Sequence, residues 1–90
     1  MIARQVFYQG RVQGVGFRYT TKQLATGFEI TGAVKNLADG RVEMLAQGEA
    51  QEVEDFLEAI RESALGAHIR EETILETAAP EGLVGFRITG

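Results

Sequence analysis

The chain has 90 residues, of which 44% are hydrophobic, and a net charge of −4, which leaves room for one small domain over residues 1–90 with one core. It has no cysteine, so disulfides, thiolate nucleophiles and cysteine-ligated metals are excluded. No apolar run approaches the ~20 residues of a membrane-spanning helix, and we expect a soluble cytoplasmic protein with no membrane partner.

The first part of the chain predicts a strand, a glycine-rich loop and a helix. Side chains alternate over residues 2–9, as they do in a half-buried strand. Three glycines, Gly10, Gly14 and Gly16, follow within seven positions. Apolar residues then recur at helical spacing, which predicts a helix over residues 18–27 with one buried face.

The rest of the chain predicts three further strands, a second helix and a short terminal strand. A hairpin signal, Asp39-Gly40, joins the second and third strands, which should be antiparallel neighbours. The second helix places four apolar residues on one face and begins with acidic side chains. The predicted elements are strands over 28–35 and 41–47, a helix over 49–64, a strand over 67–77 and a last strand around 84–88.

This order of elements predicts an α+β fold. Two strand-helix-strand units with a hairpin between them match the ferredoxin-like βαββαβ sandwich, an antiparallel sheet with two helices on one face. Each helix has a single apolar stripe, as packing on one sheet requires.

The charges are distributed unevenly along the chain. Residues 1–41 carry six basic and two acidic side chains, a net +4, whereas residues 42–90 carry three basic and eleven acidic ones, a net −8. A basic segment around a glycine loop suits a small anion. A long nucleic acid would also meet the acidic part, so we expect no nucleic-acid partner.

The glycine loop has the composition of an anion cradle. Glycine adopts positive φ and allows close backbone approach, so successive N–H groups can converge on one point, and a helix that begins there adds its unpaired donors. Arg18 lies at the junction and offers a fixed fork of donors that matches two phosphate oxygens. The plainer alternative is that a tight turn between strand and helix needs these glycines without any ligand.

Few other side chains suit catalysis. The only serine, Ser63, and the only histidine, His68, lie far in sequence from the loop, and the acids of the second helix read as a solvated face. Asn36, at the end of the second strand, could orient a water molecule, and a neutral amide would not repel a phosphate dianion. The alternative is that Asn36 only begins the turn.

Segments 10–18 (GRVQGVGFR) and 32–43 (GAVKNLADGRVE) together resemble the signatures of the acylphosphatase family, and the order of elements agrees with it. The resemblance implies a ferredoxin-like fold, hydrolysis of acyl phosphates with inorganic phosphate as product and competitor, and no metal or cofactor. It implies that Arg18 binds the phosphate and that Asn36 orients the water. It also assigns the phosphate cradle to main-chain N–H groups of Val12, Gln13, Gly14, Val15, Gly16 and Phe17.

The chain departs from this family at two places. Ala33 stands where the family commonly has tryptophan, and residues 86–90 lack the common tyrosine. Neither position carries the chemistry, so we expect changes in packing or stability.

Three other classes of protein stay open at this point. One is a non-catalytic anion-binding or regulatory module that keeps the cradle. A second is a domain like the acylphosphatase-like part of hydrogenase-maturation carbamoyltransferases, although Tyr19 replaces the proline common there. A third is a nucleic-acid module of the same fold, which the acidic balance disfavours. The physiological acyl phosphate is not named by the sequence, and a monomer is the simplest expectation.

Overall fold

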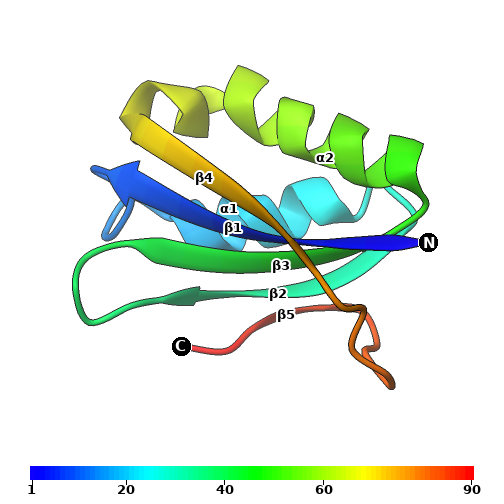
Figure 1. Ribbon diagram of the computed structural model, residues 1–90. Helices are drawn as coiled ribbons and strands as arrows, with labels where there is room; N and C mark the ends of the chain where they lie inside the picture. Colours follow the sequence, from blue (N-terminus) through cyan, green and yellow to red (C-terminus); the bar gives the residue numbers. More distant parts are fainter.

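The computed structural model describes residues 1–90 and contains five strands and two α-helices (Figure 1). A short 3₁₀ helix follows the second α-helix. In chain order the elements are β1 (Ile2–Gly10), α1 (Phe17–Ala25), β2 (Ile30–Asn36), β3 (Val42–Gly48), α2 (Ala50–Glu62), the 3₁₀ helix (Ala64–His68), β4 (Ile69–Thr77) and β5 (Phe86–Ile88).

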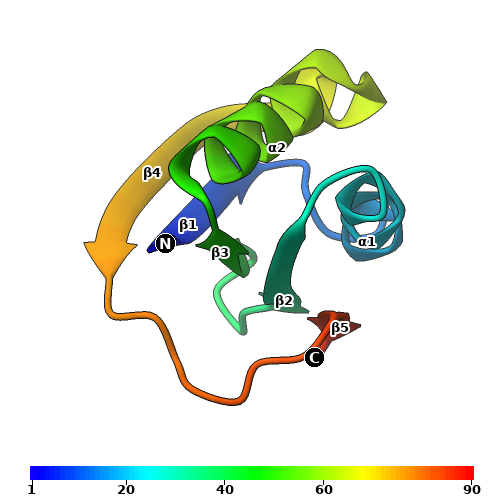
Figure 2. The same cartoon turned by 90° about the vertical axis from the view of Figure 1, so that its right-hand side faces the viewer.

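The strands form one sheet in the order β4-β1-β3-β2-β5. The pairs β1–β3, β1–β4 and β2–β3 are antiparallel, so the predicted ferredoxin-like α+β fold is confirmed. The sheet differs from the prediction at one edge, where β5 runs parallel to β2. The cause is the segment 78–85, which carries the chain from β4 across the sheet to the opposite edge (Figure 2).

Both helices cover the same face of the sheet, and segment 78–85 passes over the other face (Figure 2). Side chains at alternate positions of the strands meet the apolar stripes of the helices, as the period of two along a strand requires. The core of the molecule lies between these two layers. Its largest fully buried side chains include Val6 and Tyr8 from β1, Val34 from β2, Met44 from β3, Phe17 from α1, and Phe56 and Ile60 from α2.

The second helix ends two residues earlier than predicted. Ser63 stops it, because its hydroxyl donates to the carbonyl of Ile60 (2.7 Å) and accepts from the N–H of Leu65 (3.1 Å). Gly66, in the 3₁₀ helix that follows, packs closely against the end of α2: a Cβ there would lie 2.0 Å from the carbonyl oxygen of Arg61. Neither α-helix is long and apolar enough to span a membrane.

Candidate active site

The glycine loop joins the end of β1 to the start of α1 and is held by buried side chains at both ends. Val12 is 1% exposed, Phe17 is 2% exposed, and the ring of Phe17 packs on that of Tyr8 at a centroid distance of 5.0 Å. The N–H of Arg11 donates to the carbonyl of His68 (2.9 Å), which ties the start of the loop to the end of the 3₁₀ helix, directly before β4. The four residues between Val12 and Phe17 are exposed, so the loop presents its backbone to solvent from a fixed frame.

The exposed part of the loop has the conformation that an anion cradle requires. Gly14 (φ 79°) and Gly16 (φ 76°) are both left-handed, and an added Cβ on either would meet no atom within 4 Å. Gly16 caps α1 with no side-chain hydrogen bond, and the first turn of α1 contains no acidic residue. The first backbone N–H groups of α1 therefore remain available, at the positive end of the helix dipole.

Arg18 lies at this cradle. A hollow of about 190 Å³ is lined by backbone or side-chain atoms of Val12, Gly14, Gly16, Phe17, Arg18, Tyr19 and Ile88. The guanidinium of Arg18 donates through Nη1 to the carbonyl of Gly90 and forms no ion pair with an acidic side chain. No acidic side chain therefore neutralises its charge.

Folding pairs some of the basic residues in the first part of the chain with acidic side chains. Three of the six basic residues in the first part of the chain, Arg4, Lys35 and Arg41, pair with Glu76, Glu43 and Asp39. The three that form no ion pair are Arg11 and Arg18, which flank the loop, and Lys22 of α1. Two of the three unpaired positive charges of this part thus flank the glycine loop, which suits a small anion.

Asn36 reaches the same end of the molecule from β2. It lies opposite Val42 of β3, which in turn lies opposite Tyr8 of β1, and residues directly opposite one another share a face of the sheet. Val42 and Tyr8 are fully buried beneath the helices, so Asn36 lies on the helix-covered face where β2 ends. Its backbone N–H donates to the carbonyl of Gly90 (3.4 Å), which also accepts from Arg18.

The side chain of Asn36 has no partner within the protein. Its Oδ1 is buried and accepts no hydrogen bond, although buried polar atoms usually have one. Asn36 does not line the 190 Å³ hollow itself, so the structure places it beside the cradle and places Arg18 within it. An amide without an internal partner can give its hydrogen bonds to a bound molecule or to water.

Two of the remaining loop residues, Gln13 and Val15, do not line the hollow. Conversely, Tyr19 and Ile88 line it and were not among the residues predicted from the sequence. Ile88 belonged to a predicted strand, but its place depends on the pairing of β5 with β2, which opposes Ile88 to Val34. Tyr19 is 62% exposed. The available signal in the sequence was its position as an aromatic residue directly after Arg18.

Beneath the cradle lies an ionisable group that the sequence did not single out. Tyr8 is fully buried, and its hydroxyl has no hydrogen-bond partner. Burial, followed by the negative charge of Glu72, raises the pKa of Tyr8 far above its ordinary value of 10.0. Glu72 is itself held by Arg61, whose Nε lies 2.9 Å from its Oε1. Tyr8 is therefore a neutral support for Phe17, without acid–base function at ordinary pH.

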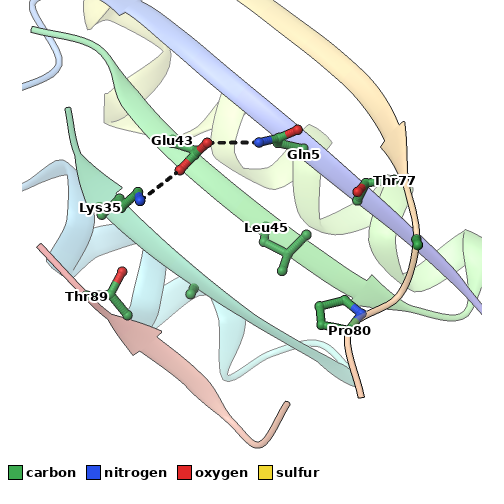
Figure 3. A pocket seen from close by; sticks show the side chains of 9 residues that line it. Gln5, Lys35, Glu43, Leu45, Thr77, Pro80 and Thr89 are labelled. Carbon is green, nitrogen blue, oxygen red and sulfur yellow. Dashed lines mark hydrogen bonds and ion pairs between the residues drawn. The ribbon is translucent and has the colours of Figure 1, made fainter. Parts of the chain in front are cut away.

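A second hollow lies on the face of the sheet that the helices leave open (Figure 3). It has a volume of about 290 Å³, and Lys35 there pairs with Glu43 (3.4 Å), which also accepts from Gln5 (2.8 Å). Ala33 lines this hollow together with Leu45. Because its only cation is already paired, this hollow is poorly suited to a phosphate, and Ala33 lies away from the cradle.

The other candidate groups lie outside the cradle. Ser63 ends α2. His68 contacts the start of the loop only through its backbone carbonyl, which accepts from the N–H of Arg11. No three side chains of histidine, aspartate or glutamate gather in a cluster that could hold a metal ion.

Comparison with known proteins points to one family. Residues 4–88 match the family described as Acylphosphatase. An acylphosphatase of Nostoc sp. is 42% identical over 88 residues, which is 98% of this chain and 86% of that protein. The crystal structure of acylphosphatase from Bacillus subtilis has a TM-score of 0.90 at 36% identity and covers both chains completely. Full-length HypF in its phosphate- and nucleotide-bound form has a TM-score of 0.85 at 28% identity, but only 12% of that chain is covered.

Proposed function

Since the chain belongs to the acylphosphatase family, whose members hydrolyse acyl phosphates, we propose that it does so by in-line attack of a water held by Asn36, on a phosphate bound by Arg18 and the loop amides. The observation that carries this proposal is the convergence, at one end of the sheet, of an arginine that no acidic side chain neutralises, a helix start without a side-chain cap and an asparagine side chain without a partner. No other hollow described above combines a free cation with backbone donors.

Binding rests on the loop and on Arg18. The main-chain N–H groups from Val12 to Phe17 surround the phosphoryl oxygens, and the guanidinium donates to two of them. Binding in this way displaces the contact between Arg18 and the oxygen of Gly90. A phosphate dianion competes for the guanidinium because it carries more charge and offers two oxygens to the fork of donors. These donors also meet the charge on the equatorial oxygens in the transition state, which is the main source of rate enhancement in phosphoryl transfer.

Asn36 acts on the nucleophile. Its side-chain amide holds a water in line with the bond between phosphorus and the leaving carboxylate. As the water oxygen bonds to phosphorus, that bond breaks, the carboxylate departs with its electron pair, and the water proton passes to a phosphate oxygen. A carboxylate is a good leaving group, so the step needs no general acid.

The acyl group extends out of the cradle between Tyr19 and Ile88. Ile88 is 39% exposed and Tyr19 is 62% exposed, so both present apolar surface at the rim. The acyl group therefore makes contacts that restrain its direction without binding it deeply. We further propose that residues 1–90 act as one domain, as a monomer, in the cytoplasm.

The test is phosphate release from benzoyl phosphate by the purified protein, with inorganic phosphate as competitor. We expect turnover by the parent protein and a loss of both substrate affinity and kcat in Arg18→Met, because ground and transition states both use the guanidinium. Arg87→Met is the matched control, since Arg87 is exposed, forms no ion pair and lies on β5 outside the cradle. A parent protein that binds phosphate but releases none would instead identify a non-catalytic anion-binding module.

A further inference from the structure

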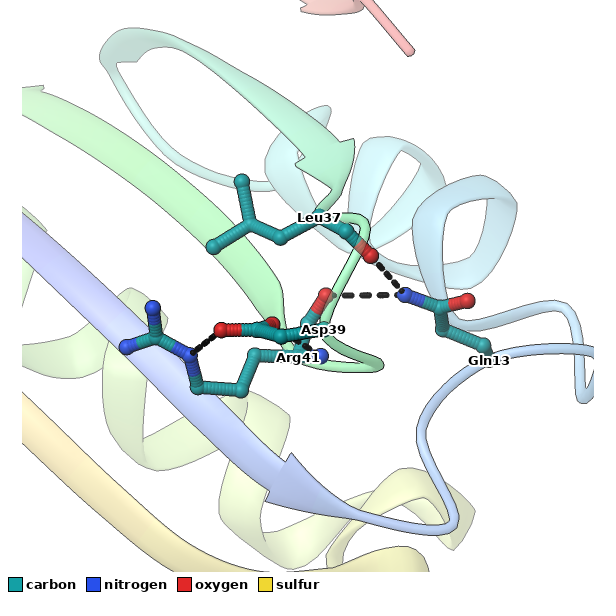
Figure 4. Close-up of polar contacts among 4 residues, drawn as sticks. All are labelled: Gln13, Leu37, Asp39 and Arg41. Carbon is teal, nitrogen blue, oxygen red and sulfur yellow. Dashed lines mark hydrogen bonds and ion pairs between the residues drawn. The ribbon is translucent and has the colours of Figure 1, made fainter.

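The side chain of Gln13 connects the cradle to the turn that follows Asn36 (Figure 4). Its Nε2 donates to the carbonyl of Leu37 (2.8 Å) and to the carbonyl of Arg41 (3.0 Å). Both partners are acceptors, so the nitrogen of the amide must face them and both of its hydrogens are used. No other side-chain hydrogen bond joins the loop to this turn.

The turn that Gln13 contacts, residues 37–41, is held together by its own hydrogen bonds. The N–H of Leu37 donates to the carbonyl of Arg41 (2.8 Å), and the N–H of Gly40 donates to the carbonyl of Leu37 (3.2 Å). Asp39 accepts from both the backbone N–H (3.0 Å) and the Nε (2.8 Å) of Arg41. A displacement of Leu37 or Arg41 relative to the loop therefore moves the whole turn and, through one peptide bond, Asn36.

Asn36 has few restraints of its own. Its Oδ1 has no partner, and its backbone N–H makes only a long contact with Gly90 (3.4 Å). The pairing with Val42 fixes it relative to β3, which is a different element from the loop and α1. The side-chain hydrogen bonds that link the loop to the turn next to Asn36 are those of Gln13.

We propose that Gln13 is a positioning residue for the hydrolysis, holding the asparagine that aims the water at a fixed distance from the bound phosphate. This inference rests on the proposed function. The backbone N–H of Gln13 remains one of the proposed cradle donors, whereas its side chain bonds to the turn at residues 37–41. Loss of the side-chain amide should therefore reduce kcat while leaving phosphate binding largely intact, because Arg18 and the start of α1 are unchanged.

The experiment compares Gln13→Met, nearly isosteric but without a donor, with the parent protein on benzoyl phosphate. We expect kcat to fall by about tenfold while the inhibition constant of inorganic phosphate changes by less than about threefold. The matched control is Gln51→Met, which removes an exposed glutamine hydrogen bond, to Asp55 (2.8 Å), on α2. A loss of phosphate affinity in proportion to kcat would overturn the proposal, since it would assign the side chain to the shape of the cradle alone.

A double-mutant cycle separates positioning from general destabilisation. If Gln13 acts through Asn36, then Gln13→Met should change kcat by less than about twofold in the Asn36→Ala background, where nothing is left to position. An equal loss of kcat in both backgrounds would overturn the proposal.

A readout independent of turnover is the NMR signal of the Asn36 side-chain amide, which should shift in Gln13→Met and stay in place in Gln51→Met. If the parent protein proves inactive, the proposed function fails. The NMR signal still reports whether the hydrogen bonds of Gln13 to the turn hold Asn36 in place. An unmoved signal would refute the positioning by Gln13 whatever the activity.

Discussion

Arg18 and Asn36, from different elements, donate to the same atom, the carbonyl oxygen of Gly90. Arg18 does so through its guanidinium and Asn36 through its backbone N–H. Arg18 belongs to the first turn of α1 and Asn36 to the last position of β2, and only the packing of α1 on the sheet brings them to one acceptor. The predicted phosphate-binding arginine and the predicted water-orienting asparagine are therefore neighbours in space.

The first prediction concerns Asn36→Ala. We expect kcat on benzoyl phosphate to fall by about a hundredfold with a much smaller change in KM, because the amide aligns the nucleophile and does not bind the phosphate. Stability should hold to within about 0.5 kcal/mol, since the side-chain oxygen has no partner to lose. Urea unfolding beside the kinetics checks both. Parent-like turnover would remove Asn36 from the mechanism.

The second prediction compares two glycines that both have positive φ. An added Cβ at Gly10 (φ 129°) would lie 2.3 Å from the carbonyl oxygen of His68, whereas at Gly40 (φ 97°) it would meet nothing within 4 Å. Gly40→Ala should therefore cost only the backbone strain, about 1 kcal/mol, and Gly10→Ala about 3 kcal/mol or more. Thermal unfolding of the two variants measures the difference. Equal losses of stability would mean that the backbone at residues 68–70 can move away from an added Cβ at Gly10 without a loss of free energy.

The third prediction concerns the dependence of stability on pH. Burial and then Glu72 raise the pKa of Tyr8 above its ordinary value of 10.0, so its contribution to stability is complete below about pH 10. Above that pH the unfolded chain loses the phenol proton while the folded protein keeps it, and stability falls by up to about 1.4 kcal/mol per pH unit. Urea unfolding at pH 9 and 11 should show a steeper loss in the parent protein than in Tyr8→Phe. Identical slopes would contradict the assignment.

The fourth prediction concerns Ala33. This residue lies opposite Leu45 in the register of β2 and β3, and both line the open-face hollow together with Pro80 (Figure 3). A tryptophan in Ala33→Trp would fill that hollow and should raise the free energy of unfolding by about 1–2 kcal/mol, through burial of apolar surface. Because the hollow lies on the face away from the helices, kcat should stay at the parent value. Chemical unfolding and the benzoyl phosphate assay test the two claims, and a less stable variant would show that segment 78–85 leaves no room for the ring.

The sequence was sufficient for the order of the elements and for the left-handed glycines of the loop, because these signals are local. Alternation over residues 2–9 and helical spacing after Phe17 depend only on neighbours in the chain, as does the need for left-handed glycines at Gly14 and Gly16. The end of α2 was misplaced because Ser63 stops the helix by hydrogen bonds that its composition did not reveal.

The partners of the cradle were settled only by tertiary structure. The parallel pairing of β5 with β2 brings Ile88 and Gly90 to Arg18, and it depends on a crossing by segment 78–85 that carries no periodic signal. The two bonds from Gln13 to the turn at residues 37–41 likewise join parts of the chain more than 20 positions apart. By itself the sequence determined which residues could bind an anion and orient a water, since those are properties of side-chain type and local backbone. Which of them meet was decided by packing, because such contacts depend on how distant elements come together.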